Sequence, residues 1–405
     1  MSRCSWNQYI FNNLLPGYSI PTCMIVHGNL RIKYFKGSGK LNFLNIHSLQ
    51  ISRACHPDSE SNCFILLNIG RIHEVFVVVR LTPGAAVDTF PPRAIRMDWN
   101  WDMASKNGNR IIAIEEHYFD PEIAALYDDK SGFTGTPVRK KMDDLYDLRI
   151  KDMDASGIDV QVLSQGAPGV QRFDAETATR LAIGANDRLH ETCQRHPDRF
   201  AGFATLASPA PEAAADELER TVKDYGFKGG MIHGLTNGEF IDQKQFWPIF
   251  ARAEALGVPI YLHPAVPHQD VVKAYYKDYL PKYPSLLTAA WGFTVETATA
   301  GIRMVLSEVF DEYPKLQIVL GHLGEGLPFL LWRISDALAR DNDYPFRDKF
   351  CNHFHITTSG NFSDPAMVCS MMEMGIDRIM FSVDYPFAPN MQGTEWMESI
   401  SLSPD

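Results

Sequence analysis

Basic residues are in the minority in this sequence. Its 405 residues include 38 Lys and Arg against 49 Asp and Glu, which gives a formal net charge of -11 at neutral pH. Proteins that bind nucleic acid or anionic membrane surfaces gather Lys and Arg into clusters. The composition therefore argues against both kinds of partner. An anionic substrate would have to be held by local charge, such as a metal ion.

Targeting and cofactor signatures are also scarce. The N-terminus shows no basic stretch followed by an apolar core, so no secretory signal is predicted. The most apolar early run, residues 63–81, contains Arg71, His73, Glu74 and Arg80, and these charges make it a poor candidate for a membrane span. No Gly-x-Gly-x-x-Gly fingerprint for dinucleotides occurs.

The cysteines form neither a disulfide framework nor a metal-binding pattern. There are 7, an odd number, and the first 63 residues hold four of them without metal-ligand spacing: Cys4, Cys23, Cys55 and Cys63. Free thiols are typical of a reducing compartment. We therefore expect a cytoplasmic protein.

Residues 1–108 form an N-terminal extension in which we find no chemistry. The runs FILLNIG and VFVVVRL could be strands, but no period is sustained, and residues 82–109 have the Pro- and Gly-containing composition of an irregular linker. Two interpretations stay open. The extension is either a small accessory region or sequence appended by a faulty gene model.

From residue 110 onwards, strand-like runs alternate with amphipathic helical patterns, which is typical of a parallel α/β sheet. Seven crossovers joining eight strands fit a (β/α)8 TIM barrel better than an open doubly wound sheet. We expect the final helix to be missing, because only residues 385–405 follow the last strand. The expected strands are residues 111–117, 159–165, 200–206, 228–234, 259–265, 317–323, 354–360 and 378–384. The expected helical stretches are residues 141–155, 174–195, 211–224, 244–256, 285–313, 327–340 and 365–375.

Ligand-type side chains recur at the C-terminal ends of these strands, where barrel enzymes place their active sites. The first strand ends in Glu115, Glu116 and His117, and strand alternation puts Glu115 and His117 on the same face. Singly, each such residue could be a solvated strand end or a satisfied histidine. Together they indicate one site, which also receives side chains from the fifth, sixth and eighth strands, namely His263, His322 and Asp384.

Carboxylate and imidazole groups suit zinc, manganese or iron, whereas calcium prefers oxygen ligands alone. Fewer than six protein ligands would leave positions for water or substrate. The pattern therefore predicts one divalent metal ion, with Zn2+ or Mn2+ preferred.

The chain from about residue 111 onwards resembles the amidohydrolase superfamily. Within it, the chain is most similar to the metal-dependent aromatic decarboxylases typified by γ-resorcylate (2,6-dihydroxybenzoate) decarboxylase. The blocks that carry the resemblance are IIAIEEHYF and residues 310–336, 354–362 and 377–387. Hydrolytic members and some other decarboxylases of the superfamily open with His-x-His, whereas this chain has Glu-x-His. That difference favours the hydroxybenzoate-type decarboxylases.

The resemblance implies a role for seven residues of this chain. His322 and Glu325 would serve acid/base chemistry and substrate contacts, and Arg333 could reach the site of a neighbouring subunit in a homodimer or homotetramer. The implied metal ligands are Glu115, His117, His263 and Asp384.

The favoured function is non-oxidative decarboxylation of a hydroxylated aromatic carboxylate such as a dihydroxybenzoate, with Asp384 as candidate proton donor. One alternative is metal-assisted hydrolysis of an ester, lactone or cyclic amide, with Asp384 as general base. Another is an inactive product. Two further residues are set aside: Glu116 should face away from Glu115 as a structural ion-pair partner, and His233 could line the pocket or simply pack.

Overall fold

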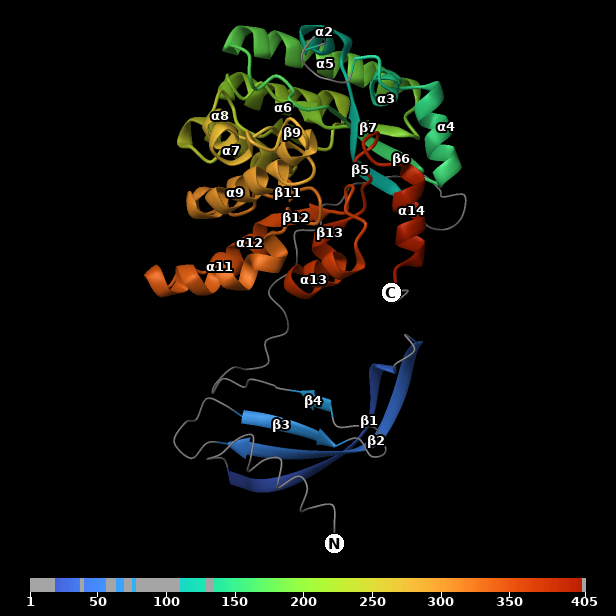
Figure 1. The fold of residues 1–405 in the computed structure, drawn as a ribbon, viewed down its shortest axis with the longest axis vertical. Helices are drawn as coiled ribbons and strands as arrows, with labels where there is room; N and C mark the ends of the chain where they lie inside the picture. Colours follow the sequence, from blue (N-terminus) through green and yellow to red (C-terminus); the bar gives the residue numbers. More distant parts are fainter. Residues whose placement is uncertain are drawn as a thin grey trace. The chain divides into compact units, whose positions relative to one another are not determined.

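The computed structural model describes residues 110–127 and 134–402, together with four N-terminal strands. The chain divides into two compact units, Met1–Arg93 and Ala94–Asp405 (Figure 1). The first unit contains an antiparallel sheet of strand order β1-β2-β3-β4. The linker expected over residues 82–109 and the boundary expected at residue 108 lie outside the described residues. The four strands are β1 (Ser19–Lys36), β2 (Lys40–Cys55), β3 (Cys63–Asn68) and β4 (Val75–Val77).

The second unit is an α/β structure whose strand pairs are all parallel. One sheet has the order β13-β12-β11-β10-β9-β8 and the other β5-β6-β7. Every strand-like run expected from the sequence forms at least part of a strand, and the third run is divided into two. The strands are β5 (Ile112–Tyr118), β6 (Val160–Gln165), β7 (Phe200–Gly202), β8 (Ala204–Thr205), β9 (Gly230–His233), β10 (Ile260–His263), β11 (Ile318–Leu320), β12 (Phe354–Thr357) and β13 (Ile379–Met380).

The two parallel sheets meet at both of their edges. Strands β7 and β8 are separated in the chain only by Phe203, so one segment belongs to both sheets. At the other edges, Glu116 of β5 forms a parallel bridge with Tyr385, which follows β13. The backbone N–H of His117 donates to the carbonyl of Tyr385 over 2.7 Å. These contacts bring the first and last strands of the unit together.

Local signals mark where the helices begin and end. Asp174 caps α5 by accepting a hydrogen bond from the backbone N–H of Thr177, and Gly226 and Gly257 end α6 and α7 in the left-handed conformation. None of the helices in the described residues is long and apolar enough to cross a membrane. The α-helices are α2 (Pro121–Tyr127), α3 (Pro137–Asp143), α4 (Asp147–Ser156), α5 (Ala175–Arg195), α6 (Pro211–Tyr225), α7 (Trp247–Leu256), α8 (Gln269–Val271), α9 (Gly292–Leu306), α10 (Val309–Glu312), α11 (Leu327–Asn342), α12 (Phe346–His353), α13 (Asp364–Met374) and α14 (Asn390–Ser399).

Helix α14 corrects one expectation. The sequence led us to expect no helix after the eighth strand, and this was wrong, because residues 390–399 form α14, which packs against α4 (Figure 1). Its sequence, NMQGTEWMES, buries the small or polar residues Asn390, Gly393 and Thr394. No apolar stripe of helical period marks such a helix. The pattern therefore gave no signal for it.

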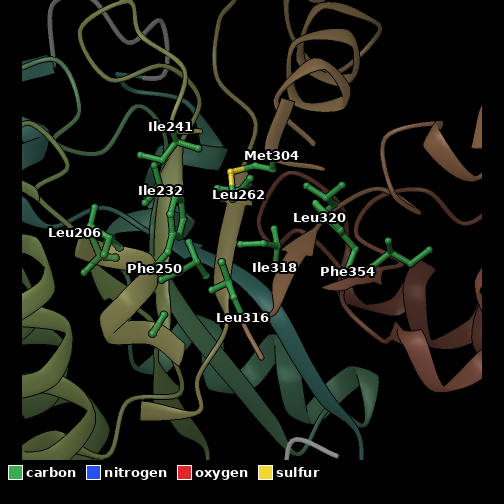
Figure 2. Close-up of a cluster of buried hydrophobic side chains, with 14 of the residues drawn as sticks. Leu206, Ile232, Ile241, Phe250, Leu262, Met304, Leu316, Ile318, Leu320 and Phe354 are labelled. Carbon is green, nitrogen blue, oxygen red and sulfur yellow. The ribbon is translucent and has the colours of Figure 1, made fainter. Parts of the chain in front are cut away.

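Alternate side chains along the strands pack into two separate apolar clusters. Ile260 and Leu262 of β10 join the large cluster between strands and helices, and Figure 2 shows Leu262 there among Leu206, Ile232 and Phe250. The intervening residues point the other way, into a small cluster of Ile114, Val162, Ala201, Phe203, Met231, Tyr261 and Val319. The sheets are thus buried on both faces, as expected of parallel strands.

Gly229, just before β9, supplies a test of how tightly these strands are packed. Its φ is 149°, a region open essentially only to glycine, and a Cβ there would lie 2.4 Å from the backbone oxygen of Pro259. We expect Gly229→Ala to lower the free energy of unfolding by about 3 kcal/mol or more. Urea denaturation followed by circular dichroism would measure this. Gly226→Ala is the matched control: its φ is 71° with no atom within 4 Å, so strain alone should cost about 1 kcal/mol. Equal effects of the two variants would contradict the packing.

Candidate active site

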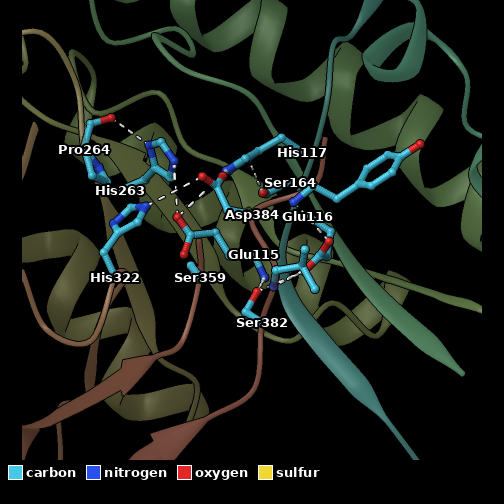
Figure 3. Close-up of polar contacts among 12 residues, drawn as sticks. Glu115, Glu116, His117, Ser164, His263, Pro264, His322, Ser359, Ser382 and Asp384 are labelled. Carbon is cyan, nitrogen blue, oxygen red and sulfur yellow. Dashed lines mark hydrogen bonds and ion pairs between the residues drawn. The ribbon is translucent and has the colours of Figure 1, made fainter. Parts of the chain in front are cut away.

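The four metal ligands implied by the sequence lie together in the structure. Glu115 and His117 come from β5, His263 ends β10, and Asp384 follows β13 (Figure 3). One potential ligand atom from each residue lies within 4.8 Å of the others. His117 Nε2 is 3.3 Å from Asp384 Oδ1, and His263 Nε2 is 3.3 Å from Glu115 Oε1. The described residues thus contain a buried cluster of two carboxylates and two imidazoles.

Hydrogen bonds to the far side of each imidazole orient both rings. His117 Nδ1 is 3.0 Å from Ser164 Oγ, and His263 Nδ1 is 2.7 Å from the carbonyl oxygen of Pro264, to which it donates. The Nε2 atom of each ring therefore faces the cluster. Such partners on the second nitrogen fix the tautomer and direction of metal-binding histidines.

The pattern of unsatisfied atoms fits a cation at the centre of this cluster. Glu115 Oε1, His117 Nε2 and Asp384 Oδ1 are buried and have no hydrogen-bond partner. The other oxygen of Glu115 accepts hydrogen bonds from the hydroxyls of Tyr261 and Thr357. Buried polar atoms without partners are costly, so three of them aimed at one point indicate a missing positive charge. Carboxylate and imidazole ligands suit a divalent transition metal or zinc.

The protonation states of the two histidines differ. Burial alone would lower the pKa of His117, but the nearby carboxylates of Asp384 and Glu115 outweigh burial and raise this pKa to about 9. Burial and the nearby charge of His117 hold the pKa of His263 well below its usual value. In the protein without metal, His117 therefore carries a proton that balances the carboxylates, while His263 is neutral.

His322 and Glu325 lie beside the metal cluster. His322 Nδ1 is 2.6 Å from Glu325 Oε1, and His322 Nε2 is 3.7 Å from Asp384 Oδ2. Burial opposes protonation of His322, yet the charges of Glu325 and Glu115, together with contacts to Asp384, raise its pKa well above the usual value. His322 thus favours its protonated form and lies next to Asp384, where it can hold or hand over a proton.

Left-handed backbone places several of these side chains. The φ angles are 52° at His322, 55° at Glu325 and 69° at Asp384, none of which is a glycine. Residues in this region are strained by roughly 1–3 kcal/mol and cluster at functional sites. Gly321 allows the close approach, because a Cβ there would lie 2.8 Å from Glu115 Oε2. The backbone around these residues thus departs from regular helix or strand geometry in order to place their side chains in the site.

Arg333 is the one implied residue that does not join the others. It is exposed on α11, two turns after the Gly321–Gly326 segment, and is not part of the cluster. The neighbouring side chains Phe329 and Trp332 are 80% and 68% exposed. Its action in a neighbouring subunit remains a prediction.

Several residues of the site carried no recognisable sequence signal. Ser164, Tyr261 and Thr357 orient the ligands through hydroxyl groups, which are too common in strands to stand out. Phe387 lies with its ring centroid 5.9 Å from that of His117. The sequence motif FSVDYPF contains it, but spacing alone does not show which aromatic ring faces the ligands.

His233 and Glu116, which the sequence analysis set aside, are both buried next to the ligands. The His233 ring centroid is 4.8 Å from that of His263, and burial lowers the pKa of His233 to about 3. Glu116 points away from Glu115, as expected, and its carboxylate accepts hydrogen bonds from the segment that carries Asp384.

Comparison with known proteins identifies the class. Residues 117–400 match the family model described as Amidohydrolase. The chain therefore belongs to the amidohydrolase family.

Its similarity to particular members is extensive. The chain is 39% identical over 310 residues to a γ-resorcylate decarboxylase of Rhizobium sp., covering 72% of this chain and 92% of that protein. A solved structure of 2,6-dihydroxybenzoate decarboxylase with 2,6-dihydroxybenzoate has a TM-score of 0.67 and 37% identity, covering 73% and 94% of the two chains. A dihydroxybenzoic acid decarboxylase of Polaromonas sp. with bound manganese and 2-nitroresorcinol has a TM-score of 0.68 and 37% identity, covering 73% and 92%.

The raised pKa of His117 makes metal binding depend on pH. A metal ligand must be the neutral imidazole, so below pH about 9 an incoming ion has to displace the His117 proton. We expect the apparent affinity to rise by about tenfold per pH unit between pH 6.5 and 8.5, and to level off above pH 9. Calorimetric titration with Mn2+ in buffers of different ionisation enthalpy should show at least one proton released per ion at pH 7.5. Binding without proton release would show that His117 is neutral beforehand.

Proposed function

We propose that this protein is a metal-dependent, non-oxidative decarboxylase of a hydroxylated aromatic carboxylate such as a dihydroxybenzoate. The observation that carries the proposal is the cluster of Glu115, His117, His263 and Asp384, with the His322 imidazole 3.7 Å from its Asp384 member. The similarity to decarboxylases that act on 2,6-dihydroxybenzoate supports the substrate class. The bound manganese of a related structure supports Mn2+ as the cofactor, with Zn2+ as the other candidate.

We also propose that the eight strand segments of the second unit close into a (β/α)8 barrel with residues 109–405 as the catalytic domain. The segment shared by β7 and β8 and the bridge between Glu116 and Tyr385 support closure. The small apolar cluster made by alternate strand residues would then be the barrel interior. The ligands would lie at the C-terminal mouth.

The residues of the site can supply the proton that decarboxylation requires. A bound divalent ion would supply a chelating centre for the substrate carboxylate and an ortho hydroxyl, and would stabilise developing negative charge. Asp384 donates a proton to the ring carbon that bears the carboxylate. The bond from that carbon to the carboxylate then breaks, carbon dioxide leaves, and the ring regains aromaticity. His322, 3.7 Å from Asp384 Oδ2 and bonded to Glu325, is placed to return a proton to Asp384.

A metal-assisted hydrolase is the alternative in the same family. The same four ligands could lower the pKa of a water molecule, with Asp384 accepting its proton. That enzyme would consume water and cleave an ester, lactone or cyclic amide without releasing carbon dioxide. The Glu-x-His opening and the similarity to decarboxylases favour the first function.

We place the protein in the cytoplasm as a homodimer or homotetramer without nucleic-acid or membrane partners. Cys193, Cys351 and Cys369 of the second unit are free thiols, which supports a reducing compartment. The exposed apolar side chains around Arg333 support a subunit contact there.

The central test of the function is release of carbon dioxide. Protein loaded with Mn2+ or Zn2+ should release it from one or more hydroxybenzoates, and Asp384→Asn should lower kcat by about 100-fold or more, because the amide cannot donate the proton. Asp377→Asn is the matched control, since Asp377 is exposed in the 3-10 helix Ile376–Arg378. Loss of ester or lactone substrate without any carbon dioxide would favour the hydrolase.

The role of Arg333 can be tested by mixing subunits. Arg333→Ala and Glu115→Ala proteins should each be nearly inactive, the first through loss of a bidentate contact to the substrate carboxylate and the second through loss of a ligand. A mixed dimer would contain one site with both groups intact, so about a quarter to a half of the activity should return. Arg340→Ala, on the same helix and paired with Asp336, is the control and should need no complementation. No recovery with subunit exchange confirmed would place Arg333 outside the catalytic role.

A further inference from the structure

Asp384 adopts an uncommon backbone conformation. Its φ of 69° lies in the left-handed region, which few residues other than glycine, asparagine and aspartate adopt. The residue follows β13 and is not itself part of a strand. The backbone on either side of Asp384 therefore decides where its carboxylate points.

Glu116 makes the contacts that hold this segment. Its Oε1 accepts hydrogen bonds from Ser382 Oγ and from the backbone N–H of Val383, each over 3.0 Å. Its Oε2 accepts one from the backbone N–H of Tyr385 over 3.3 Å. One carboxylate thus bonds the residues immediately before and after Asp384. Figure 3 shows Glu116 and Ser382 close to Glu115 and Asp384.

A buried arginine sets the direction of the fourth hydrogen bond. Arg149 Nη1 donates to Gln161 Oε1 over 3.1 Å, which turns the amide nitrogen of Gln161 towards Glu116 Oε2 at 3.1 Å. Arg149 is fully buried, and its guanidinium lies 4.6 Å from the centroid of the Tyr385 ring. Glu116 thus accepts four hydrogen bonds, two on each carboxylate oxygen, so both oxygens must be able to accept.

We propose that Glu116 is a positioning residue, which holds Asp384 at the metal by bonding both of its chain neighbours at once. Glu115 and His117 reach the metal from one face of β5, and Glu116 acts on the fourth ligand from the other face. The effect on catalysis rests on the proposed function, whereas the effect on metal binding does not. A rival account gives Glu116 only a structural role, as the buried negative charge near Arg149.

Two variants separate these accounts. Glu116→Gln keeps one acceptor but sets an amide NH2 against the Tyr385 N–H and the Gln161 amide. The double variant Glu116→Gln, Gln161→Glu restores a buried charge, now bonded directly to Arg149, and lets the introduced amide donate to the introduced carboxylate. It does not restore an acceptor for the Tyr385 N–H. The double variant therefore separates an effect on stability from an effect on metal positioning.

The measurements are metal affinity, by competition with a chelator, and the visible absorption of the Co2+-loaded protein, which reports ligand geometry. We expect Glu116→Gln to weaken Mn2+ binding by about tenfold or more and to alter the Co2+ spectrum, as loss of partners around ligands generally does. The double variant should recover thermal stability but neither the affinity nor the spectrum. In active protein, kcat should fall more than KM changes, since Asp384 is the proton donor.

Controls keep the outcome decisive. Glu217→Gln removes another buried carboxylate, paired with Arg220 on α6, and should lower stability while leaving Mn2+ affinity unchanged. If Glu116→Gln does not fold, Ser382→Ala is the second variant. It removes one of the four donors to Glu116, together with the acceptor of the Glu115 backbone N–H, and should weaken Mn2+ binding about threefold, so unchanged binding would count against the proposal.

The proposal is overturned if metal affinity returns together with stability in the double variant, or if neither Glu116→Gln nor Ser382→Ala weakens binding. The two proposals can also fail separately. If the variants change Mn2+ affinity and the Co2+ spectrum as expected, but the protein releases no carbon dioxide from any hydroxybenzoate, the proposed function is wrong and the positioning role of Glu116 still holds.

Discussion

The balance of charge between two buried carboxylates governs this site. Glu115 is fully buried and Asp384 largely so, and their ligand atoms lie within 4.8 Å of one another. Like charges at that distance in a poorly hydrated interior repel strongly, so the pair is stabilised by positive charge nearby. The carboxylates in turn raise the pKa of both His117 and His322, which favours their protonated forms in the metal-free protein. A bound divalent ion would supply most of this positive charge in place of the protons. Metal binding would therefore release protons.

Strand β5 positions the charged side chains of the site. Its residues 115 to 117 alternate between two faces, so Glu115 and His117 reach the ligand cluster while Glu116 reaches the segment around Asp384. The same strand pairs with β6 on one side and bridges to Tyr385 on the other. The ligands from opposite ends of the chain are therefore held by the contact that joins the sheets.

Much of the site could be predicted from the sequence, because each ligand stands at the end of a recognisable apolar run. Glu115, His117, His263 and Asp384 were all identified in this way, and the structure brings them together. The hydroxyl groups of Ser164, Tyr261 and Thr357 were missed, since serine, threonine and tyrosine occur in strands for many reasons. Helix α14 was missed because its buried side is polar or small and leaves no periodic apolar pattern.

The sequence by itself determined the parallel α/β character, the order of the strands and the chemistry of the ligands, because these depend on local periodicity and residue type. Only the tertiary structure decided which atoms of these side chains face one another, that the pKa of His117 is raised while that of His263 is lowered, and that Glu116 bonds on both sides of Asp384. Those properties depend on contacts between residues far apart in the chain, such as Glu116 and Tyr385, separated by 269 positions. No local pattern encodes such distances, since they result from how the strands pair and how completely the interior excludes water.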